Sequence, residues 1–363
     1  MHNATRMQRE AATPPRIERN VPLAPLTTLG IGGPAKVFFR AESVDDIRGA
    51  LRWASSEREP ILILAGGSNV LIADEGYPGV VVHIALRGIN VESEDSKSVV
   101  VKVAAGEPWD DFVAMAVSNR WAGIECLSGI PGSTGATPIQ NVGAYGQEVS
   151  ETIVSVKTLD RSTGRVTSLT NRECGFGYRS SLFKNREKDR YVVLAVTFRL
   201  RPNGAASVRY PELRKNLEER GASLEDLQQV RDTVIAVRRR KGMVLDPNDP
   251  DTRSDGSFFM NPIISRSAFE RLSARAGNMP NFPAGDDVKL SAAWLIENAG
   301  FTKGFTHGNV GLSSKHSLAI VNRGGGKARE VVELVRMIQQ KVREKFGVEI
   351  QPEPNFIGVS TSS

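Results

Sequence analysis

The chain of 363 residues lacks several features that mark particular classes of protein. It has two cysteines, Cys126 and Cys174, far apart and without a C-x-x-C pair. This spacing excludes a disulfide scaffold and a cysteine–zinc cluster, and predicts two buried free thiols in a reducing compartment. No run of about 18 apolar residues occurs, so we expect no transmembrane helix. The G-x-x-x-x-G-K-[ST] motif is also missing, which argues against a P-loop nucleotidase.

An excess of charge of one sign is missing as well. Lys and Arg total 47 against 41 Asp and Glu, a net charge of +6, which is too weak to predict a nucleic-acid partner. Residues 1–20 lack the apolar centre of a secretory signal, so we expect a disordered leader and a cytoplasmic protein. The 40% hydrophobic content is ordinary for a folded chain, and the length predicts two or three domains.

Local patterns predict a mixed α+β chain without regular β–α–β repetition. Capping boxes at Ser43/Asp46 and Ser223/Asp226 would open two helices, and Lys327–Phe346 forms the clearest amphipathic helix. The segment 201–206 is a natural boundary between domains. The predicted strands are Lys36–Arg40, Ile61–Leu64, Gly79–Ile84, Val99–Ala104, Thr152–Leu159, Arg165–Leu169, Tyr191–Leu200 and Leu318–Asn322.

Three glycine-rich stretches could hold a ligand. Gly30–Ala35 matches G-x-G-x-x-A only formally, because a strand pattern rather than a helix follows it, so a Rossmann fold is not expected. Ala65–Val70 follows a buried strand, and its backbone N–H groups could turn towards a pyrophosphate. A plain tight turn would explain the same residues. Ile130–Gly146 is a long uncharged loop of small residues, which would allow close approach to a flat aromatic ligand.

These loops belong to an ordered set of motifs. The chain contains T-x-G-I-G-G-P-A, L-x-G-G-S-N-V-L, I-P-G-x-x-G-A-x-P-I-Q-N-x-G-A-Y-G, F-G-Y-R-x-S-x-F-K, G-S-F-F-x-N-P and P-E-x-x-F-I-G, in that order. All six together resemble the UDP-N-acetylenolpyruvoylglucosamine reductases, flavoenzymes of bacterial peptidoglycan synthesis and cell-wall biogenesis. The resemblance covers Asn20 to Gly358.

The resemblance implies the fold. It predicts a two-lobed FAD-binding domain of the p-cresol methylhydroxylase/vanillyl-alcohol oxidase type over 21–203, with lobes at about 21–90 and 91–203. A separate α+β substrate-binding domain would occupy 204–346. The segment 347–363 would return with a catalytic glutamate. We also expect a monomer with no metal, no nucleic acid and no membrane partner.

The resemblance implies the reaction too. NADPH would reduce non-covalently bound FAD, and the flavin would pass the hydride from N5 to C3 of UDP-N-acetylglucosamine enolpyruvate, giving UDP-N-acetylmuramate. Arg179 matches the family arginine that faces the substrate carboxylate, where its charge would stabilise an enediolate. Ser257 matches the proton donor to C2. Glu353, between two prolines, matches the acid that would hydrogen-bond the enediolate if protonated. Without the motifs, each would be taken for an ordinary surface or turn residue.

Other positions carry over from the same motifs. The cofactor-binding candidates are Gly66, Gly67, Ser68, Asn69, Val70, Pro131, Gly132, Gly135, Ala136, Gln140, Asn141, Gly143 and Ala144. The substrate-binding candidates are Tyr145, Tyr178, Tyr210, Lys241, Asn261 and His316. Two positions depart from the family pattern: Met260 stands where relatives have Lys or Thr, and Asn355 replaces a common Arg.

Two alternatives are open. Another flavin oxidoreductase of the superfamily would often tether flavin through His or Cys, yet Cys126 lies only near the FAD loops and no histidine lies in them. The histidines are His2, His83, His307 and His316. A non-enzymatic nucleotide-binding protein would be expected to have lost Arg179, Ser257 or Glu353, and all three residue types are present.

Overall fold

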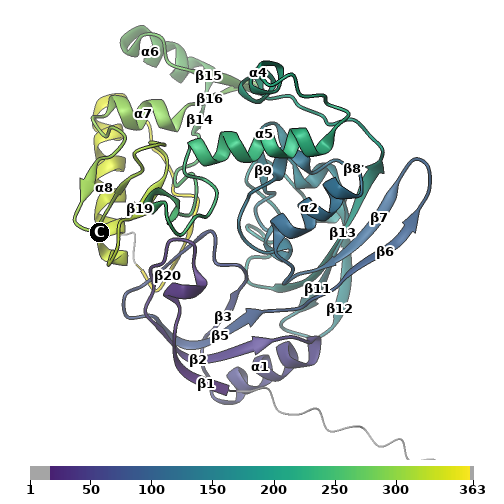
Figure 1. The fold of residues 1–363 in the computed structure, drawn as a ribbon. Coiled ribbons are helices and arrows are strands. Elements are labelled where there is room, and N and C mark those ends of the chain that lie inside the picture. Colours follow the sequence, from purple (N-terminus) through teal and green to yellow (C-terminus); the bar gives the residue numbers. More distant parts are fainter. Residues whose placement is uncertain (1–16, 360–363) are drawn as a thin grey trace, which may run out of the picture.

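The computed structural model describes residues 17–359, and Figure 1 shows their fold. Most of the predicted leader over 1–20 lies outside the described residues. Its last positions belong to strand β1 (Ile17–Pro22), so strand structure begins earlier than the predicted Val21. The side chains of β1 are mostly exposed, and the strand is held by antiparallel pairing with β2 (Pro34–Ala41). It therefore lacks the buried alternation by which a strand is found in a sequence.

The first lobe is a four-stranded sheet in the order β1-β2-β5-β3, with α1 packed against it (Figure 1). Strand β5 pairs in parallel with both β2 and β3. The predicted capping box at Ser43 and Asp46 is present and starts α1. Gly30–Ala35 leads into a strand, not a helix, as expected. The remaining elements of this lobe are α1 (Val44–Ser56), β3 (Ile61–Leu64), β4 (Val70–Ile72) and β5 (Tyr77–Ile84).

The second lobe is an antiparallel sheet in the order β12-β11-β13-β7-β6, with β8 also on β13. Helix α2 covers it, and Phe112 of that helix meets Phe198 of β13 at 5.2 Å between ring centroids. The predicted lobe boundary at 90/91 falls inside β6. Its elements are β6 (Ile89–Glu94), β7 (Val99–Ala104), α2 (Trp109–Ser118), β8 (Trp121–Ala122), β11 (Ile153–Asp160), β12 (Val166–Thr170), α3 (Asn171–Cys174) and β13 (Tyr191–Pro202).

The long loop between β8 and β11 contains only short elements. They are the 3₁₀ turns η2 (Glu125–Leu127), η3 (Thr134–Ala136) and η4 (Val149–Glu151), with the small hairpin β9 (Gly143–Ala144) and β10 (Gln147–Glu148). This loop lies against β13 and β7 through η3. It is thus an ordered part of the second lobe.

Helices α4 (Pro211–Glu219) and α5 (Leu227–Arg240) differ from the prediction in two ways. Helix α5 starts later than Ser223, because the side chain of Asp226 accepts hydrogen bonds from the next turn and is itself the N-cap. Buried residues of both helices, including Leu213 and Val234, belong to the hydrophobic core that spans the two lobes, and α5 packs on α2 and η2 of the second lobe. The chain therefore passes from this hydrophobic core to that of the C-terminal domain after α5, and not at the expected residue 204.

The C-terminal domain has its own core around α8, which ends at Phe346 as predicted and is capped by Gly347. Two three-stranded sheets, β14-β16-β15 and β17-β18-β19, accompany it. Helix α6 and the β15–β16 hairpin extend away from the body (Figure 1). The elements are η5 (Pro250–Thr252), β14 (Ile263–Ile264), α6 (Arg266–Ala276), β15 (Asn281–Ala284), β16 (Asp287–Leu290), α7 (Ala292–Asn298), β17 (Thr306–His307), β18 (Val310–Leu312), β19 (Ile320–Asn322) and α8 (Ala328–Phe346).

The end of the chain returns to the first lobe. Strand β20 (Asn355–Ile357) pairs in parallel with β4, Asn355 opposite Val70. Leu29 and Leu71 of the first lobe are buried in the C-terminal core. This contact closes the space where the two lobes and the C-terminal domain meet. Within residues 17–359, no helix has the length and hydropathy needed to cross a membrane.

Candidate active site

A cavity of about 1470 Å³ lies where the lobes and the C-terminal domain meet. It is lined by the three predicted catalytic residues and by all six predicted substrate residues. Eleven of the thirteen cofactor candidates also line it, the exceptions being Gly132 and Asn141. The structure therefore brings together residues from segments that are far apart in the sequence.

The loop after β3 is built on close backbone approach. A Cβ on Gly66 would come within 2.6 Å of the Gly132 Cα, and one on Gly67, where φ is +60°, within 1.9 Å of the Leu26 carbonyl oxygen. The backbone N–H of Gly66 donates to the Ser133 hydroxyl. Within the described part of the chain, the backbone N–H groups of Gly67, Ser68 and Asn69 have no protein acceptor. These three donors fit the predicted pyrophosphate site.

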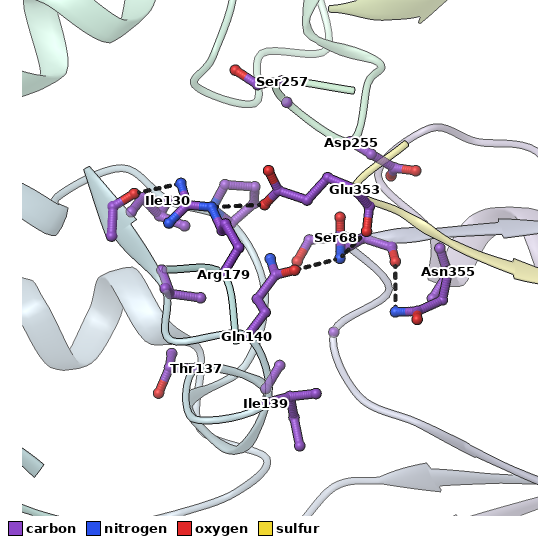
Figure 2. A pocket seen from close by; sticks show the side chains of 18 of the residues that line it. Ser68, Ile130, Thr137, Ile139, Gln140, Arg179, Asp255, Ser257, Glu353 and Asn355 are labelled. Atoms are coloured by element: carbon purple, nitrogen blue, oxygen red, sulfur yellow. Dashed lines mark hydrogen bonds and ion pairs between the residues drawn. The ribbon is translucent and has the colours of Figure 1, made fainter. Parts of the chain in front are cut away.

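Asn69 connects this loop to two others. Its amide nitrogen donates to Gln140 Oε1 at 2.9 Å and to the Glu353 carbonyl oxygen at 3.3 Å. Its own carbonyl oxygen accepts from the backbone N–H of Asn355 at 3.0 Å and from the Asn355 side-chain amide at 3.4 Å, and Figure 2 draws the second of these contacts. The cofactor candidates Asn69 and Gln140 therefore use part of their hydrogen-bonding capacity to hold the loops together.

Asn141 and Gly132 are the two cofactor candidates that do not line the cavity. The Asn141 amide donates to Glu148 and to the Gly177 carbonyl, and its oxygen accepts from Ser150. At 1% exposure and with φ +49°, it stabilises the loop from within. A Cβ on Gly132 would lie 2.5 Å from the Ser68 hydroxyl, so this glycine makes room for the neighbouring loop.

Arg179 and Glu353 form an ion pair at the cavity wall. Arg179 Nε lies 3.1 Å from Glu353 Oε1, and Arg179 Nη2 donates to the Gly143 carbonyl at 2.9 Å. Figure 2 shows the two side chains facing each other, with Ser257 on the segment above them in this view. The backbone φ of Arg179 is +50°, an unfavourable value for a side chain of this kind. Such local strain is typical of functional sites.

Backbone pairing places Ser257 next to Glu353. The Phe258 carbonyl accepts from the Glu353 N–H at 2.8 Å, while the Phe258 N–H donates to Leu318 at 2.7 Å. Ser257 therefore adjoins a residue that is fixed on both sides. Gly256 before it has φ +74°, and a Cβ added to it would meet nothing within 4 Å.

The substrate candidates Tyr145, Tyr210, Lys241 and His316 gather in one part of the cavity. Tyr145 and Tyr210 meet edge to face at 5.6 Å between ring centroids, and Lys241 Nζ lies 6.0 Å from the Tyr145 ring. Lys241 also donates to Glu212 Oε2 at 2.6 Å. Burial, with the Lys241 and Lys303 charges, lowers the pKa of His316 to about 4, so its ring is neutral near pH 7.

Tyr178 and Asn261 lie on another side of the cavity. Lys289 Nζ is 4.7 Å from the Tyr178 ring centroid, and burial raises the pKa of the Tyr178 hydroxyl. Asn261 accepts from the Ala292 N–H and so fixes the start of α7. Of the two departures, Met260 directly precedes Asn261 in the chain, and Asn355 contributes the β20 contact with β4 described above.

Comparison with known proteins agrees with this site. Two family models match: "UDP-N-acetylenolpyruvoylglucosamine reductase, C-terminal domain" at residues 246–357 and "FAD binding domain" at 35–170. The reductase of that name from Thermobifida fusca is 48% identical, covering 94% of this chain and 98% of its own length, and that from Salinispora arenicola is 50% identical over 92% and 94%. The chain belongs to the UDP-N-acetylenolpyruvoylglucosamine reductase family.

A solved reductase structure supports the same conclusion. The Thermus caldophilus UDP-N-acetylenolpyruvylglucosamine reductase matches with a TM-score of 0.64 and 25% identity, covering 94% of this chain and 99% of that one. The predicted fold, a two-lobed FAD-binding domain of the p-cresol methylhydroxylase/vanillyl-alcohol oxidase type with a separate α+β domain, is confirmed. The match at 246–357 also begins after α5, where the change of core occurs.

The motif reasoning did not select every charged residue of the cavity, and it passed over Lys184 although this residue ends the F-G-Y-R-x-S-x-F-K motif. Lys184 Nζ is buried and has no hydrogen-bond partner in the described chain. Burial lowers its pKa, the Glu353 charge acts in the opposite direction, and Arg179 adds to the lowering. Arg238 and Asp255 also line the cavity. Asp255 is buried and lies directly before the G-S-F-F motif. Because it is outside the motif, the family pattern does not indicate it.

The reactive groups needed for a covalent flavin link are scarce here. Cys126 and Cys174 are buried and free, as predicted, and burial raises the pKa of both thiols. Neither lines the cavity, and His316 is the one histidine among the described residues that does. Over residues 17–359, no cluster of three potential metal ligands occurs.

Proposed function

We propose that this reductase uses NADPH and FAD to reduce UDP-N-acetylglucosamine enolpyruvate to UDP-N-acetylmuramate in peptidoglycan precursor synthesis. The observation that carries the proposal is the convergence of Arg179, Ser257 and Glu353, from three distant segments, on one cavity that also contains the glycine loops. The cytoplasmic location, the monomeric state and NADPH as the reductant stay predictions.

The cavity suits non-covalent FAD. The available N–H groups of Gly67, Ser68 and Asn69 would bind the diphosphate, and the small residues from Gly135 to Ala144 leave room for the flat ring. Bound FAD would supply the hydride carrier between NADPH and the substrate double bond. The protein would orient the ring and exclude competing reactions.

Arg179 would bind the substrate carboxylate. One guanidinium nitrogen is fixed by the Gly143 carbonyl, which orients the planar group towards the cavity. A guanidinium suits bidentate carboxylate binding, and its charge would stabilise the negative charge that develops as the double bond is reduced. The strained backbone at Arg179 is consistent with an orientation set in advance.

Ser257 would donate the proton to C2. Its place beside Phe258, which pairs with both Leu318 and Glu353, fixes the approach of the hydroxyl from the C-terminal domain. A serine is a weak acid, so the proton acceptor must be strongly basic, as an enediolate carbon is.

Glu353 would change partner when substrate binds. In the free protein it pairs with Arg179, and the arriving substrate carboxylate would compete for the same guanidinium. Two carboxylates at one cation favour protonation of one of them. A protonated Glu353 could then donate a hydrogen bond to the enediolate, as the resemblance implies.

The diphosphate and sugar of the substrate would bind at the other group of side chains. Lys241 would exchange its contact with Glu212 for the diphosphate, and Tyr145 and Tyr210 would pack on the nucleotide-sugar. His316 would act there as a neutral hydrogen-bonding group. Tyr178 and Asn261 would complete the pocket near the enolpyruvyl group.

An anaerobic experiment tests the function. The flavin of the purified protein should bleach with NADPH and regain colour when the enolpyruvyl substrate is added. A flavin that stays bleached would rule out the proposed reaction. Denaturation should release all the flavin, whereas flavin retained on the polypeptide would favour the covalent oxidase alternative.

A further inference from the structure

Asp255 is a buried acid that the proposed mechanism does not use. It is 8% exposed, and its Oδ2 has no hydrogen-bond partner among the described residues. Its Oδ1 accepts one hydrogen bond, from the Thr28 hydroxyl at 3.0 Å. A buried carboxylate normally needs several donors or a cation, so this environment favours the uncharged form.

The Thr28 contact connects Asp255 to the FAD side of the cavity. The Thr28 N–H donates to the Gly67 carbonyl at 3.0 Å, and the neighbouring Leu26 carbonyl leaves no room for a side chain at Gly67. A continuous path therefore runs from the glycine loop through Thr28 to Asp255. Figure 2 shows Asp255 on the same side of the pocket as Ser68.

The other end of this path is Ser257. Gly256 separates the two residues, has φ +74° and leaves open space where a Cβ would lie, while its N–H donates to the Ser254 hydroxyl at 3.3 Å. Ser257 is therefore held from two sides: by Phe258, through its pairing with Leu318 and Glu353, and by Asp255. Loss of one support would let the serine move about Gly256.

We propose that Asp255 is a positioning residue, whose uncharged carboxyl, bonded by Thr28, holds the Gly256–Ser257 segment against the Gly67 loop. Ionisation would place an unpaired charge in a buried site. The carboxylate would then draw in water or rotate towards solvent about Gly256 and displace the Ser257 hydroxyl. This inference rests on the proposed role of Ser257 as proton donor.

Burial sets the pH range in which the Asp255 carboxyl ionises. It raises the pKa of Asp255 from 3.8 to about 8, and the Thr28 hydrogen bond opposes this only in part. The flanking segments carry other ionisable groups, and no charge on them contributes to the raised pKa. These groups are Asp251, Arg253, Lys315, His316 and Glu353.

The test compares Asp255→Asn and Asp255→Ala with the wild-type holoenzyme from neutral to alkaline pH. The readouts are the two half-reactions, measured separately as flavin bleaching by NADPH and recolouring by substrate. The wild-type recolouring rate should fall with one ionisation near pH 8. Asp255→Asn keeps an uncharged acceptor for Thr28, so it should recolour at the wild-type rate at neutral pH and lose that alkaline decline.

Asp255→Ala removes the contact at every pH. Its recolouring should be slower by roughly 10- to 100-fold, the usual cost of a small misplacement of a catalytic group, while bleaching is retained. Asp249→Asn is the matched control, because Asp249 lies in the same region but pairs with Lys315, and it should keep the wild-type profile. Equal alkaline decline in wild type and Asp255→Asn would overturn the inference.

A second measurement does not depend on turnover. Between pH 4 and about pH 8 the folded protein holds the Asp255 proton and the unfolded chain does not. The free energy of unfolding of the wild type therefore falls as pH rises through that range. Wild type should therefore lose stability relative to Asp255→Asn as pH rises. No such divergence would also overturn the inference. Failure of wild type to recolour at any pH, with this divergence present, would instead count against the proposed function.

Discussion

The two walls of the cavity are built differently. The glycine wall, formed by loops 65–70 and 130–146, is held by backbone approach and offers unused N–H groups. The charged wall, formed by Arg179, Lys184, Ser257 and Glu353, is assembled from three segments that meet only in the folded chain. The first wall suits a cofactor that stays bound, and the second suits a substrate whose charge changes during the reaction.

This difference has a consequence for mutation. On the glycine wall a side chain cannot be added without moving backbone, so changes there should affect folding and FAD retention together. On the charged wall the side chains line an open cavity, so truncation should affect chemistry with little effect on the fold. The following variants separate these two outcomes.

The largest effect is expected on the charged wall, for Ser257→Ala. Removal of the proton donor should slow substrate reduction by about 10²- to 10⁴-fold, the usual contribution of a general acid. Flavin bleaching by NADPH should stay near the wild-type rate, because Ser257 acts only in the second half-reaction. Stopped-flow absorbance of the flavin measures both rates in one sample. Equal loss of both half-reactions would assign Ser257 to the fold or the flavin site instead.

A smaller but broader effect is expected on the glycine wall, for Gly67→Ala. The added Cβ would lie 1.9 Å from the Leu26 carbonyl oxygen, at a positive φ. Strain and overlap together should cost roughly 2–5 kcal/mol of unfolding free energy and reduce FAD retention. Chemical denaturation and the flavin-to-protein absorbance ratio measure the two effects.

Gly164→Ala is the matched control for Gly67→Ala. Gly164 has a similar φ of +68° but meets nothing within 4 Å of an added Cβ. The substitution should lower the free energy of unfolding by only about 1–2 kcal/mol and leave the flavin content unchanged. If Gly67→Ala were no worse than Gly164→Ala, close packing would not explain the glycine wall.

The sequence predicted the two walls to different extents, for physical reasons. Glycine, serine and asparagine next to a buried strand indicate a loop with accessible N–H groups, and such a signal is local. It could not show that Asn141 turns its amide inward to Glu148 and Gly177, because that choice depends on tertiary contacts. The charged wall could be assigned only through the family motifs, since no local pattern brings Arg179 to Glu353.

The same reasoning explains the domain boundary. Segment 201–206 has the composition of a linker, yet α4 and α5 bury Leu213 and Val234 in the hydrophobic core that spans the two lobes. Their apolar faces indicate burial without indicating which partner they meet. The N-cap of α5 was also misplaced, since Ser223 and Asp226 both suit a cap and only Asp226 accepts from the following turn.

The smallest effect should come from Asn69, which joins the two walls. Asn69→Ala removes the bonds to Gln140 and to the Glu353 carbonyl, and should cost about 1–2 kcal/mol. Asn355→Ala is its control. This substitution removes the contact of 3.4 Å from the Asn355 side-chain amide to the Asn69 carbonyl, while the backbone N–H of residue 355 still donates to Asn69. Its effect on the free energy of unfolding should therefore stay within about 0.5 kcal/mol. Urea unfolding of both variants checks the difference.

A double-mutant cycle then decides what Asn69 joins. Combined with Gln140→Ala, Asn69→Ala should show a coupling energy of about 0.5 kcal/mol or more, because the two side chains share a hydrogen bond at 2.9 Å. Additive costs would mean that loops 65–70 and 130–146 of the glycine wall are held together by backbone contacts and do not depend on this side-chain bond. Coupling would instead mean that the Asn69 amide, which also donates to the Glu353 carbonyl, is held in place in part by Gln140.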